Sequence, residues 1–309
     1  MIVVCGDALI DFIPVRLPGG RPAYLPAPGG SCRNIASGLG RLGAKVGFMG
    51  GVSNDFFGDQ VAASLQADGV SLAYTARLDD PTTLAFVKLG DGEPAYAFYD
   101  EPSAHRSWTR AASPPPGAEV TALHVGSLTL IAPPVADECL AMMREQKGRR
   151  LLSIDPNCRP SLIYDLAGYR SRLREMFRLA DIIKLSAADL DYLQPGADPD
   201  TVARGWITDG AHLVVLTRGG DGASAWVGNG QVSVVSGRVE LVDTVGAGDS
   251  FIAGTLFQLD RMGLLSTDAL DRLDRTGAQA VLAFAARVAA VTCSRAGADP
   301  PRLDELERG

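Results

Sequence analysis

From residue 122 onward, short apolar runs typical of buried strands alternate with longer stretches of helical character. The strand-like runs cover residues 123–125, 151–154, 182–185 and 213–217, and two further strands are expected within 226–242. Parallel neighbours in a sheet need a crossover connection, which is usually a helix that packs on the sheet. The alternation therefore predicts an α/β fold with a doubly wound, mostly parallel sheet flanked by helices.

The first third of the chain adds further strands and helices to this fold, and it also contains segments of a different character. Residues 2–5 and 46–49 are typical of buried strands, and residues 34–42 and 56–67 of helices. Residues 12–28 are rich in Pro and Gly, which predicts loop or short edge strands. Strand-like residues flank Gly90-Asp91-Gly92, which indicates a hairpin. We predict a core from residues 1–11, 29–71 and 103–309, and a small inserted β-sheet from 12–28 and 72–102.

Composition restricts the class of function. The 309 residues carry a net charge of −7, which argues against a nucleic-acid partner because such proteins need a basic face. The five cysteines are scattered and form no Cys-x-x-Cys pair, as expected for reduced cytosolic thiols. The most apolar stretch, 278–291, contains Arg287 and is short for a bilayer, so a buried helix is expected. The chain starts with a strand-like run and not with a leader, so we expect a cytoplasmic protein without membrane contact.

The stretch Asp243-Thr244-Val245-Gly246-Ala247-Gly248-Asp249-Ser250-Phe251 combines a glycine-rich turn, an acid and the start of an apolar helix. Glycines let the backbone approach a ligand, and a helix start offers unpaired N–H groups with partial positive charge. Such a turn suits phosphate, and Asp249 beside it could accept a proton from a hydroxyl. The structural alternative is a tight turn with Asp249 as a helix cap. The pattern matches neither the P-loop nor the dinucleotide fingerprint, because Phe251 stands where the fingerprint has its last glycine.

Three motifs follow one another as they do in the ribokinase-like (PfkB) carbohydrate kinases. They are Gly29-Gly30-Ser31-Cys32-Arg33-Asn34-Ile35-Ala36 with Leu42-Gly43, then Gly51-Val52-Ser53-Asn54-Asp55-Phe56-Phe57-Gly58, then residues 243–254. The resemblance covers residues 6–301. Within the family, segments 6–11, 155–160 and 291–301 are most similar to the fructokinase branch, although kinases for 2-keto-3-deoxygluconate share many of these residues.

The resemblance implies an ATP-dependent kinase that phosphorylates a hydroxyl of a ketose, with D-fructose as the expected substrate. Asp249 is the implied base, and Gly246, Ala247 and Gly248 are the implied anion hole for the transferring phosphate. The implied sugar-binding residues are Asp11, Gly30 and Asn34 together with Asp249. Asp7 is a weaker member of this set, because it could equally cap the loop after the first strand.

Other positions implied by the resemblance keep their alternatives. Phe98 and Tyr96 lie on the predicted hairpin, which is a lid in this family, and either pack on the sugar or form lid core or a dimer contact. Arg159 follows a predicted strand end beside Asn157, where ligands gather in such sheets. It is expected to bind substrate, for example by holding a phosphate, or else to pair with a nearby acid.

The implied cofactors are ATP and Mg²⁺, with K⁺ as in many relatives. Ser186, Thr217, Gly219 and Gly248 resemble the nucleotide-binding positions, and residues 278–290 and 295–299 are expected to wall the adenine. Mg²⁺ is expected to reach Asp189 through water. Asp243 and the carbonyl of Val245 resemble a monovalent-cation site.

Two departures from the family pattern bear on this reading. Ser186-Ala187-Ala188-Asp189 replaces the usual Asn-x-x-Glu, which shortens the carboxylate and puts the metal geometry in question. Cys32-Arg33 replaces the small residues usual before Asn34. Arg33 and Arg106 are therefore candidate selectors of an acidic or phosphorylated substrate, and solvated surface arginines are the alternative.

Three other functions stay open on the sequence. Two are a 2-keto-3-deoxygluconate kinase and a nucleoside kinase of the same family. The third is a sensor that binds sugar or nucleotide without catalysis, against which the retained Asp249 argues. Because exposed edges of lid strands often pair between chains, a homodimer through the lid is expected.

Overall fold

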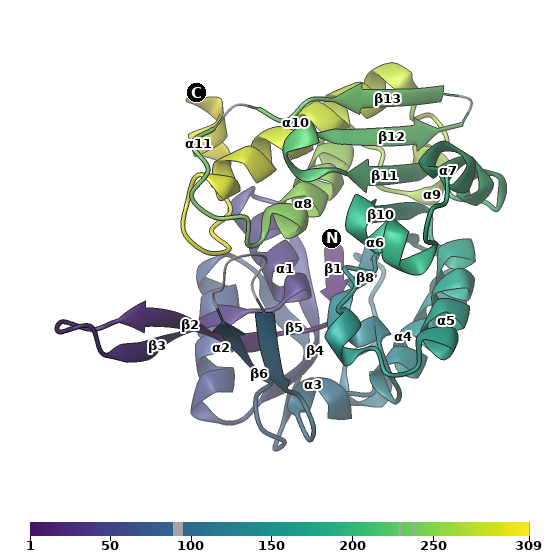
Figure 1. Cartoon of the computed structure of the whole chain (residues 1–309). Coiled ribbons are helices and arrows are strands. Elements are labelled where there is room, and N and C mark those ends of the chain that lie inside the picture. The colour runs from purple at the N-terminus through teal and green to yellow at the C-terminus, as the bar shows by residue number, and fades with distance from the viewer. Residues whose placement is uncertain (89–94, 229, 238, 309) are drawn as a thin grey trace.

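The computed structural model of the chain describes residues 1–88, 95–228, 230–237 and 239–308 (Figure 1). Within these residues, nine strands form one sheet in the order β13-β12-β11-β10-β9-β8-β1-β4-β5. Neighbours are parallel except for the pairs β11-β12 and β12-β13. The strands are β1 (Ile2–Cys5), β4 (Val46–Ser53), β5 (Ser71–Leu78), β8 (Ala122–Gly126), β9 (Leu151–Asp155), β10 (Ile182–Ser186), β11 (Leu213–Thr217), β12 (Ala223–Val227) and β13 (Gly230–Val234). The predicted mostly parallel α/β fold is confirmed.

Helices cover both faces of this sheet, as side-chain alternation in β1 shows. Ile2 and Val4 belong to one buried apolar cluster, and Val3 and Cys5 to a second cluster on the opposite face. The helices are α1 (Ser31–Arg41), α2 (Phe56–Ala67), α3 (Ala104–Ser107), α4 (Val135–Gln146), α5 (Leu166–Leu179), α6 (Ala187–Leu193), α7 (Pro199–Thr208), α8 (Ala247–Arg261), α9 (Thr267–Leu270), α10 (Arg275–Cys293) and α11 (Leu303–Glu307). Helices α1, α8 and α10 contribute to the first cluster, and α4 and α5 to the second.

A second, smaller sheet of the described residues has the order β3-β2-β6-β7. Its strands are β2 (Leu9–Arg16), β3 (Pro22–Gly29), β6 (Leu84–Lys88) and β7 (Ala95–Tyr99). The β2–β3 hairpin projects away from the larger sheet (Figure 1). Residues 12–28 thus form most of two paired strands, where loop or short edge strands were expected. The prolines lie mainly in the edge strand β3, which has ladder partners on one side only and so tolerates residues without an N–H group. The predicted turn Gly90-Asp91-Gly92 lies outside the described residues.

Two boundaries of the predicted insertion differ from the structure. Residues 71–78 form β5, which pairs in parallel with β4 in the larger sheet and not with the strands of the smaller sheet. Helix α2 links these two strands, so β4, α2 and β5 make a β-α-β unit of the kind that builds parallel sheets. At the other boundary, residues 9–11, which were assigned to the core, already belong to β2 of the small sheet.

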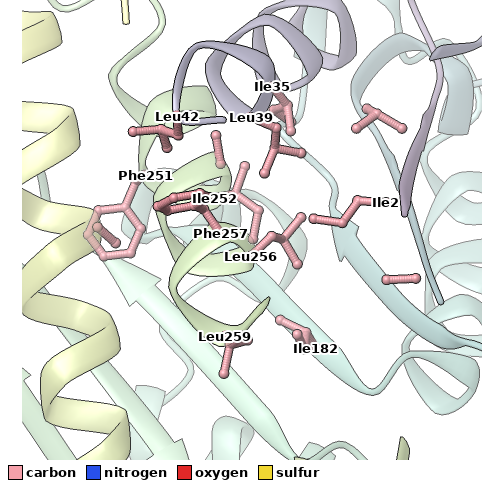
Figure 2. Packing of buried hydrophobic residues seen from close by; sticks show 14 of the residues in the cluster. Ile2, Ile35, Leu39, Leu42, Ile182, Phe251, Ile252, Leu256, Phe257 and Leu259 are labelled. Carbon is pink, nitrogen blue, oxygen red and sulfur yellow. The ribbon is translucent and has the colours of Figure 1, made fainter. Parts of the chain in front are cut away.

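Helices α1 and α8 pack on each other above the centre of the sheet, and this contact positions the site. In Figure 2, Ile35 and Leu39 of α1 lie against Ile252 and Leu256 of α8, and all four side chains are buried. Burial of each such side chain contributes about 1.5–3 kcal/mol. The starts of both helices are therefore held together at one end of the sheet.

Helix α10 is the predicted buried helix, although it is longer than expected. At 19 residues it is, among the described residues, the one helix long and apolar enough to cross a membrane by length and composition. Its apolar stripe, however, faces the core: Val281, Leu282, Ala285 and Val288 are buried in the same cluster as α8. These contacts identify α10 as a core helix of this fold.

Candidate active site

A cavity of about 650 Å³ opens where the carboxyl ends of the central strands meet the small sheet. Its wall includes Asp7 after β1, Ser127 after β8 and Asn157 after β9. Tyr96 and Phe98 of β7 line it from the small sheet, with ring centroids 5.7 Å apart and nearly parallel rings. Ligands of doubly wound sheets bind at such strand ends. The cavity is therefore the candidate active site.

The predicted anion-binding turn lies on this cavity. Gly246 precedes α8 in the left-handed conformation, with φ of 76°, and a Cβ added to it would lie 2.7 Å from the Cβ of Ala298. Gly246 and Gly248 line the cavity, whereas the N–H of Ala247 donates to the carbonyl of Thr244 at 3.2 Å. Among the described residues no side chain caps α8. The first amides of this helix are thus suited to an external anion.

Asp249 is buried in the first turn of α8 and is held by three side chains from other segments. Its Oδ1 accepts from the hydroxyl of Ser31 at 2.6 Å and from Nδ2 of Asn157 at 3.4 Å. Its Oδ2 accepts from Nδ2 of Asn34 at 2.9 Å. Burial raises the pKa of Asp249, while these bonds from Ser31 and Asn34, and the charges of Arg159 and Lys184, oppose the increase. The carboxylate is oriented toward the cavity and is not a simple helix cap.

Asp11 of β2 is the second cavity carboxyl. Burial, followed by the neighbouring charge of Asp7, raises the pKa of Asp11 to about 7, against the opposing charge of Arg159. Asp7 lines the cavity and accepts from the backbone N–H of Ser31 at 2.9 Å, which holds the start of α1; its role in sugar binding stays a prediction. Gly30 lines the cavity with φ of 99°, and a Cβ there would lie 2.9 Å from the carbonyl oxygen of Asp7. The glycine is needed for this close approach.

Arg159 lies on the cavity wall and supports Asn157. Its Nη1 donates to Oδ1 of Asn157 at 2.6 Å and to the carbonyls of Asn157 and Cys158. Asn157 has φ of 37°, and its Nδ2 also donates to the hydroxyl of Ser31 at 2.9 Å. Arg159 therefore orients an asparagine that reaches Asp249, and its charge acts on both Asp11 and Asp249.

A buried ion pair lies beneath the anion-binding turn, and the sequence reasoning missed it. Nζ of Lys184 on β10 is 2.6 Å from Oδ2 of Asp155 on β9. A Cβ on Gly248 would lie 3.1 Å from the same Nζ, so the ammonium lies close to the start of α8. The pKa of Asp155 is raised to about 6, because the effect of burial outweighs the opposing charge of Lys184. A lysine inside the apolar run 182–185 was the available signal.

The predicted nucleotide positions occupy the ends of neighbouring strands. Ser186 and Thr217 are paired across β10 and β11, and Gly219 begins the turn after β11. Ser186 and Asp189 form a capping box at the start of α6. Oδ2 of Asp189 accepts from Ser186, and Oδ1 accepts from the N–H of Cys158 at 2.7 Å. The shortened acid thus has structural contacts on both oxygens, and its contact with a metal through water stays a prediction.

Asp243 and Val245 lie together in the loop before α8. Oδ1 of Asp243 accepts from the N–H of Val245 at 3.0 Å, and Oδ2 accepts from the N–H of Gly297 at 2.8 Å. These bonds tie the anion-binding turn to the 295–299 loop. Among the described residues, no group of three or more His, Cys, Asp or Glu side chains could hold a metal ion.

Neither candidate selector arginine is among the described residues that line the cavity. Arg106 donates to Glu101 at 2.7 Å and to the carbonyl of Pro133 at 3.1 Å. Arg33 is buried behind Asn34, and its Nη1 lies 3.3 Å from Oδ1 of Asn34. The structure therefore gives no support to direct selection of an acidic substrate by either side chain.

A buried carboxylate at a helix start without a side-chain cap, facing a polar cavity, is the arrangement that a kinase acting on a sugar hydroxyl needs. The family model of pfkB family carbohydrate kinases matches residues 1–305, and the chain belongs to this family. It is 40% identical over 274 residues to a fructokinase of Rhizobium leguminosarum bv. trifolii, covering 89% of this chain and 84% of the relative. The predicted resemblance is confirmed.

Solved structures agree with this assignment. The crystal structure of fructokinase with bound ATP from Xylella fastidiosa superposes with a TM-score of 0.91 at 30% identity, covering 99% of this chain and 97% of that one. Fructokinase from Vibrio cholerae O395, bound to fructose, ADP and calcium ion, gives a TM-score of 0.86 at 27% identity over 99% of this chain and 97% of that one.

Proposed function

We propose that this protein is an ATP-dependent fructokinase, which converts D-fructose and ATP to a fructose phosphate and ADP. The observation that carries the proposal is the position of Asp249, whose carboxylate is held by Ser31 and Asn34 at the mouth of the anion-binding turn. The fructokinase relatives, which cover most of the chain, supply the substrate class.

In this mechanism Asp249 accepts the proton of the attacking sugar hydroxyl. The hydroxyl oxygen forms a bond to the γ-phosphorus as the bond to the bridging oxygen of ADP breaks. An ionised carboxylate has about four acceptor positions, and Asp249 uses three of them for protein donors. Since two of these donors occupy Oδ1, we assign proton acceptance to Oδ2. Gly246 and Gly248 present the start of α8 to the charge that develops on the phosphoryl group.

The sugar is bound between the core and the small sheet. Asp11, Gly30 and Asn34 supply polar contacts, and Phe98 closes the cavity from β7, where an aromatic ring can pack on the sugar. The small sheet acts as a lid that excludes water, the competing acceptor of phosphate. Neither Arg33 nor Arg106 is among the described residues that line the cavity, and the fructokinase relatives favour a neutral ketose over 2-keto-3-deoxygluconate.

ATP binds on the side of β10 and β11, where Ser186, Thr217 and Gly219 lie, with α10 and the 295–299 loop around the adenine. Mg²⁺, when bound, neutralises phosphate charge. Asp189 would hold the ion through water, since Mg²⁺ in kinase sites is bound mainly by phosphates and water and needs few protein carboxylates. Asp243 and the carbonyl of Val245 are the proposed K⁺ site. We place the enzyme in the cytoplasm, where ATP is abundant.

We further propose a homodimer through the lid. Tyr24 and Leu25 of the edge strand β3 are 48% and 56% exposed, and an edge strand with exposed apolar side chains is suited to pairing with a second copy. Light scattering of the purified protein tests this part of the proposal, because a monomer at micromolar concentration would contradict it.

The deciding experiment is ADP release from MgATP with fructose, 2-keto-3-deoxygluconate, ribose, tagatose, adenosine and fructose 6-phosphate. A rate with fructose at least tenfold above the others supports the proposal. Selective turnover of another acceptor overturns the choice of sugar while leaving the kinase assignment intact. Sugar binding without ADP release would identify a sensor.

A further inference from the structure

The structure places Arg33 behind Asn34, one of the residues that line the cavity. It lies in the first turn of α1, is buried, and is not itself among the described residues that line the cavity. Its Nη1 is 3.3 Å from Oδ1 of Asn34. Asn34 is therefore the cavity residue that Arg33 contacts by a hydrogen bond, while its charge also lowers the pKa of Asp11.

The oxygen of the Asn34 amide faces a hydrogen-bond donor, and its nitrogen faces an acceptor. Its carbonyl Oδ1 accepts from the guanidinium of Arg33, and its Nδ2 donates to Oδ2 of Asp249 at 2.9 Å. A flipped amide would place its NH₂ against the guanidinium and its carbonyl against the carboxylate. Both contacts would be repulsive. The guanidinium therefore selects one orientation of the amide.

Arg33 is itself held from the opposite side. Its Nη2 is 3.9 Å from Oδ2 of Asp68, the buried residue that follows α2, and Asp68 also accepts from Nε of Arg41 at 2.8 Å. Nε of Arg33 has no hydrogen-bond partner among the described residues. An arginine buried with a spare donor is destabilising, and an apolar side chain would avoid that cost.

We propose that Arg33 is a positioning residue that fixes the Asn34 amide so that its NH₂ group holds the catalytic Asp249. This rests on the proposed role of Asp249 as the base. The guanidinium does not touch the sugar, so it acts on turnover and not on the binding of ATP. The departure at position 33 is thus part of the catalytic apparatus of this chain.

A direct test observes the Asn34 amide and does not depend on the substrate. The chain has four asparagines, Asn34, Asn54, Asn157 and Asn229, so selective ¹⁵N labelling gives few side-chain amide signals, and Asn34→Ala assigns the relevant pair. Arg33→Ala should fold, because it removes a buried guanidinium whose Nε has no hydrogen-bond partner among the described residues. We expect its Asn34 amide protons to exchange with water at least tenfold faster. Unchanged protection in Arg33→Ala and in the longer Arg33→Met would overturn the proposal, whether or not the protein phosphorylates fructose.

Kinetics then separate positioning from general destabilisation. We expect about tenfold lower kcat in Arg33→Ala with an unchanged KM for ATP, and partial recovery in Arg33→Lys, which keeps a donor. In an Asn34→Ala background, Arg33→Ala should have no further effect on kcat, since its target is gone. Additive losses would contradict action through Asn34. Arg302→Met is the matched control: its Nη2 also lies 3.9 Å from Asp68, it is not among the described residues that line the cavity, and the variant should keep kcat within twofold at saturating substrates.

Discussion

Lys184 and Asp155 form a buried ion pair, 2.6 Å from ammonium nitrogen to carboxylate oxygen, on neighbouring strands under the start of α8. The register pairs Ile183 with Ile154, which sets the two charged side chains next to each other on adjacent strands. The lysine also acts on Asp249, since its charge opposes the raised pKa of that carboxyl. The ammonium thus adds fixed positive charge to the partial charge of the helix start.

Lys184→Met is expected to reduce both stability and turnover. The substitution leaves the Asp155 carboxyl buried without its partner, which should cost about 3 kcal/mol of unfolding free energy at neutral pH. It also removes charge from the phosphate site, so kcat should fall about 100-fold. The double variant Lys184→Met/Asp155→Asn, measured by urea unfolding and steady-state kinetics, should regain stability but not kcat. Full recovery of kcat in the double variant would refute the electrostatic role.

Asp249→Asn distinguishes the catalytic role from the capping role. The amide keeps the size of the side chain but cannot accept the proton, so kcat should fall about 10³–10⁴-fold with little change in thermal stability. Asp274→Asn is the control, because Asp274 caps α10 by accepting from the N–H of Gly277 at 2.8 Å. Asparagine is an equally good cap, so this variant should keep its activity. Similar kinetics for the two variants would support the capping alternative.

Asp11→Asn is expected to stabilise the fold in a pH-dependent way. The pKa of Asp11 is raised from 3.8 to about 7 in the folded protein, so its ionisation opposes folding. The stability that its protonated form contributes is present below about pH 4 and is lost as the pH rises through about 7. Relative to wild type, the variant should therefore gain little at pH 4 and up to about 4 kcal/mol at pH 8. Its KM for sugar should rise at least tenfold, and an equal stability difference at both pH values would contradict the assignment.

Gly246→Ala tests the shape of the anion-binding turn. The new Cβ would combine an unfavourable φ of 76° with a 2.7 Å contact to Ala298, which should cost about 2–4 kcal/mol and shift the amides at the phosphate site. We expect kcat to fall at least tenfold. Gly263→Ala, beyond the other end of α8, is strained by φ of 67° but has no described atom within 4 Å. It should lose about 1 kcal/mol and keep kcat, so an equal kcat loss in both variants would show that strain alone is responsible.

The sequence predicted most of the architecture because the relevant signals are local. Apolar runs separated by helical stretches are enough to indicate a parallel sheet, and the 243–251 stretch carries its own turn, acid and helix start. Helix α2 was predicted to the residue, since Asp55 caps it and its apolar positions are periodic. The boundary of the small sheet was misplaced because the residues of a strand such as β5 do not indicate which of two sheets it joins.

The missing parts of the site depend on contacts between distant segments. Ser31 is an ordinary small residue of the motif until the fold places its hydroxyl on Asp249, 218 positions away. Lys184 and Asp155 look like isolated charges until the strand register pairs them. Arg33 was singled out as unusual. The sequence alone does not predict whether its side chain points into the cavity or toward Asp68, because that depends on how α1 packs.

The distribution of these contacts has a consequence for how activity appears during folding. The three donors to Asp249 come from positions 31, 34 and 157, and no segment shorter than residues 31–249 contains this carboxylate with all of them. Contacts of such long sequence separation form late, because loop closure must precede them. In a refolding experiment, helical circular dichroism should therefore recover before turnover. A break in the chain between Asn157 and Asp249 would leave two pieces that are each inactive until they associate.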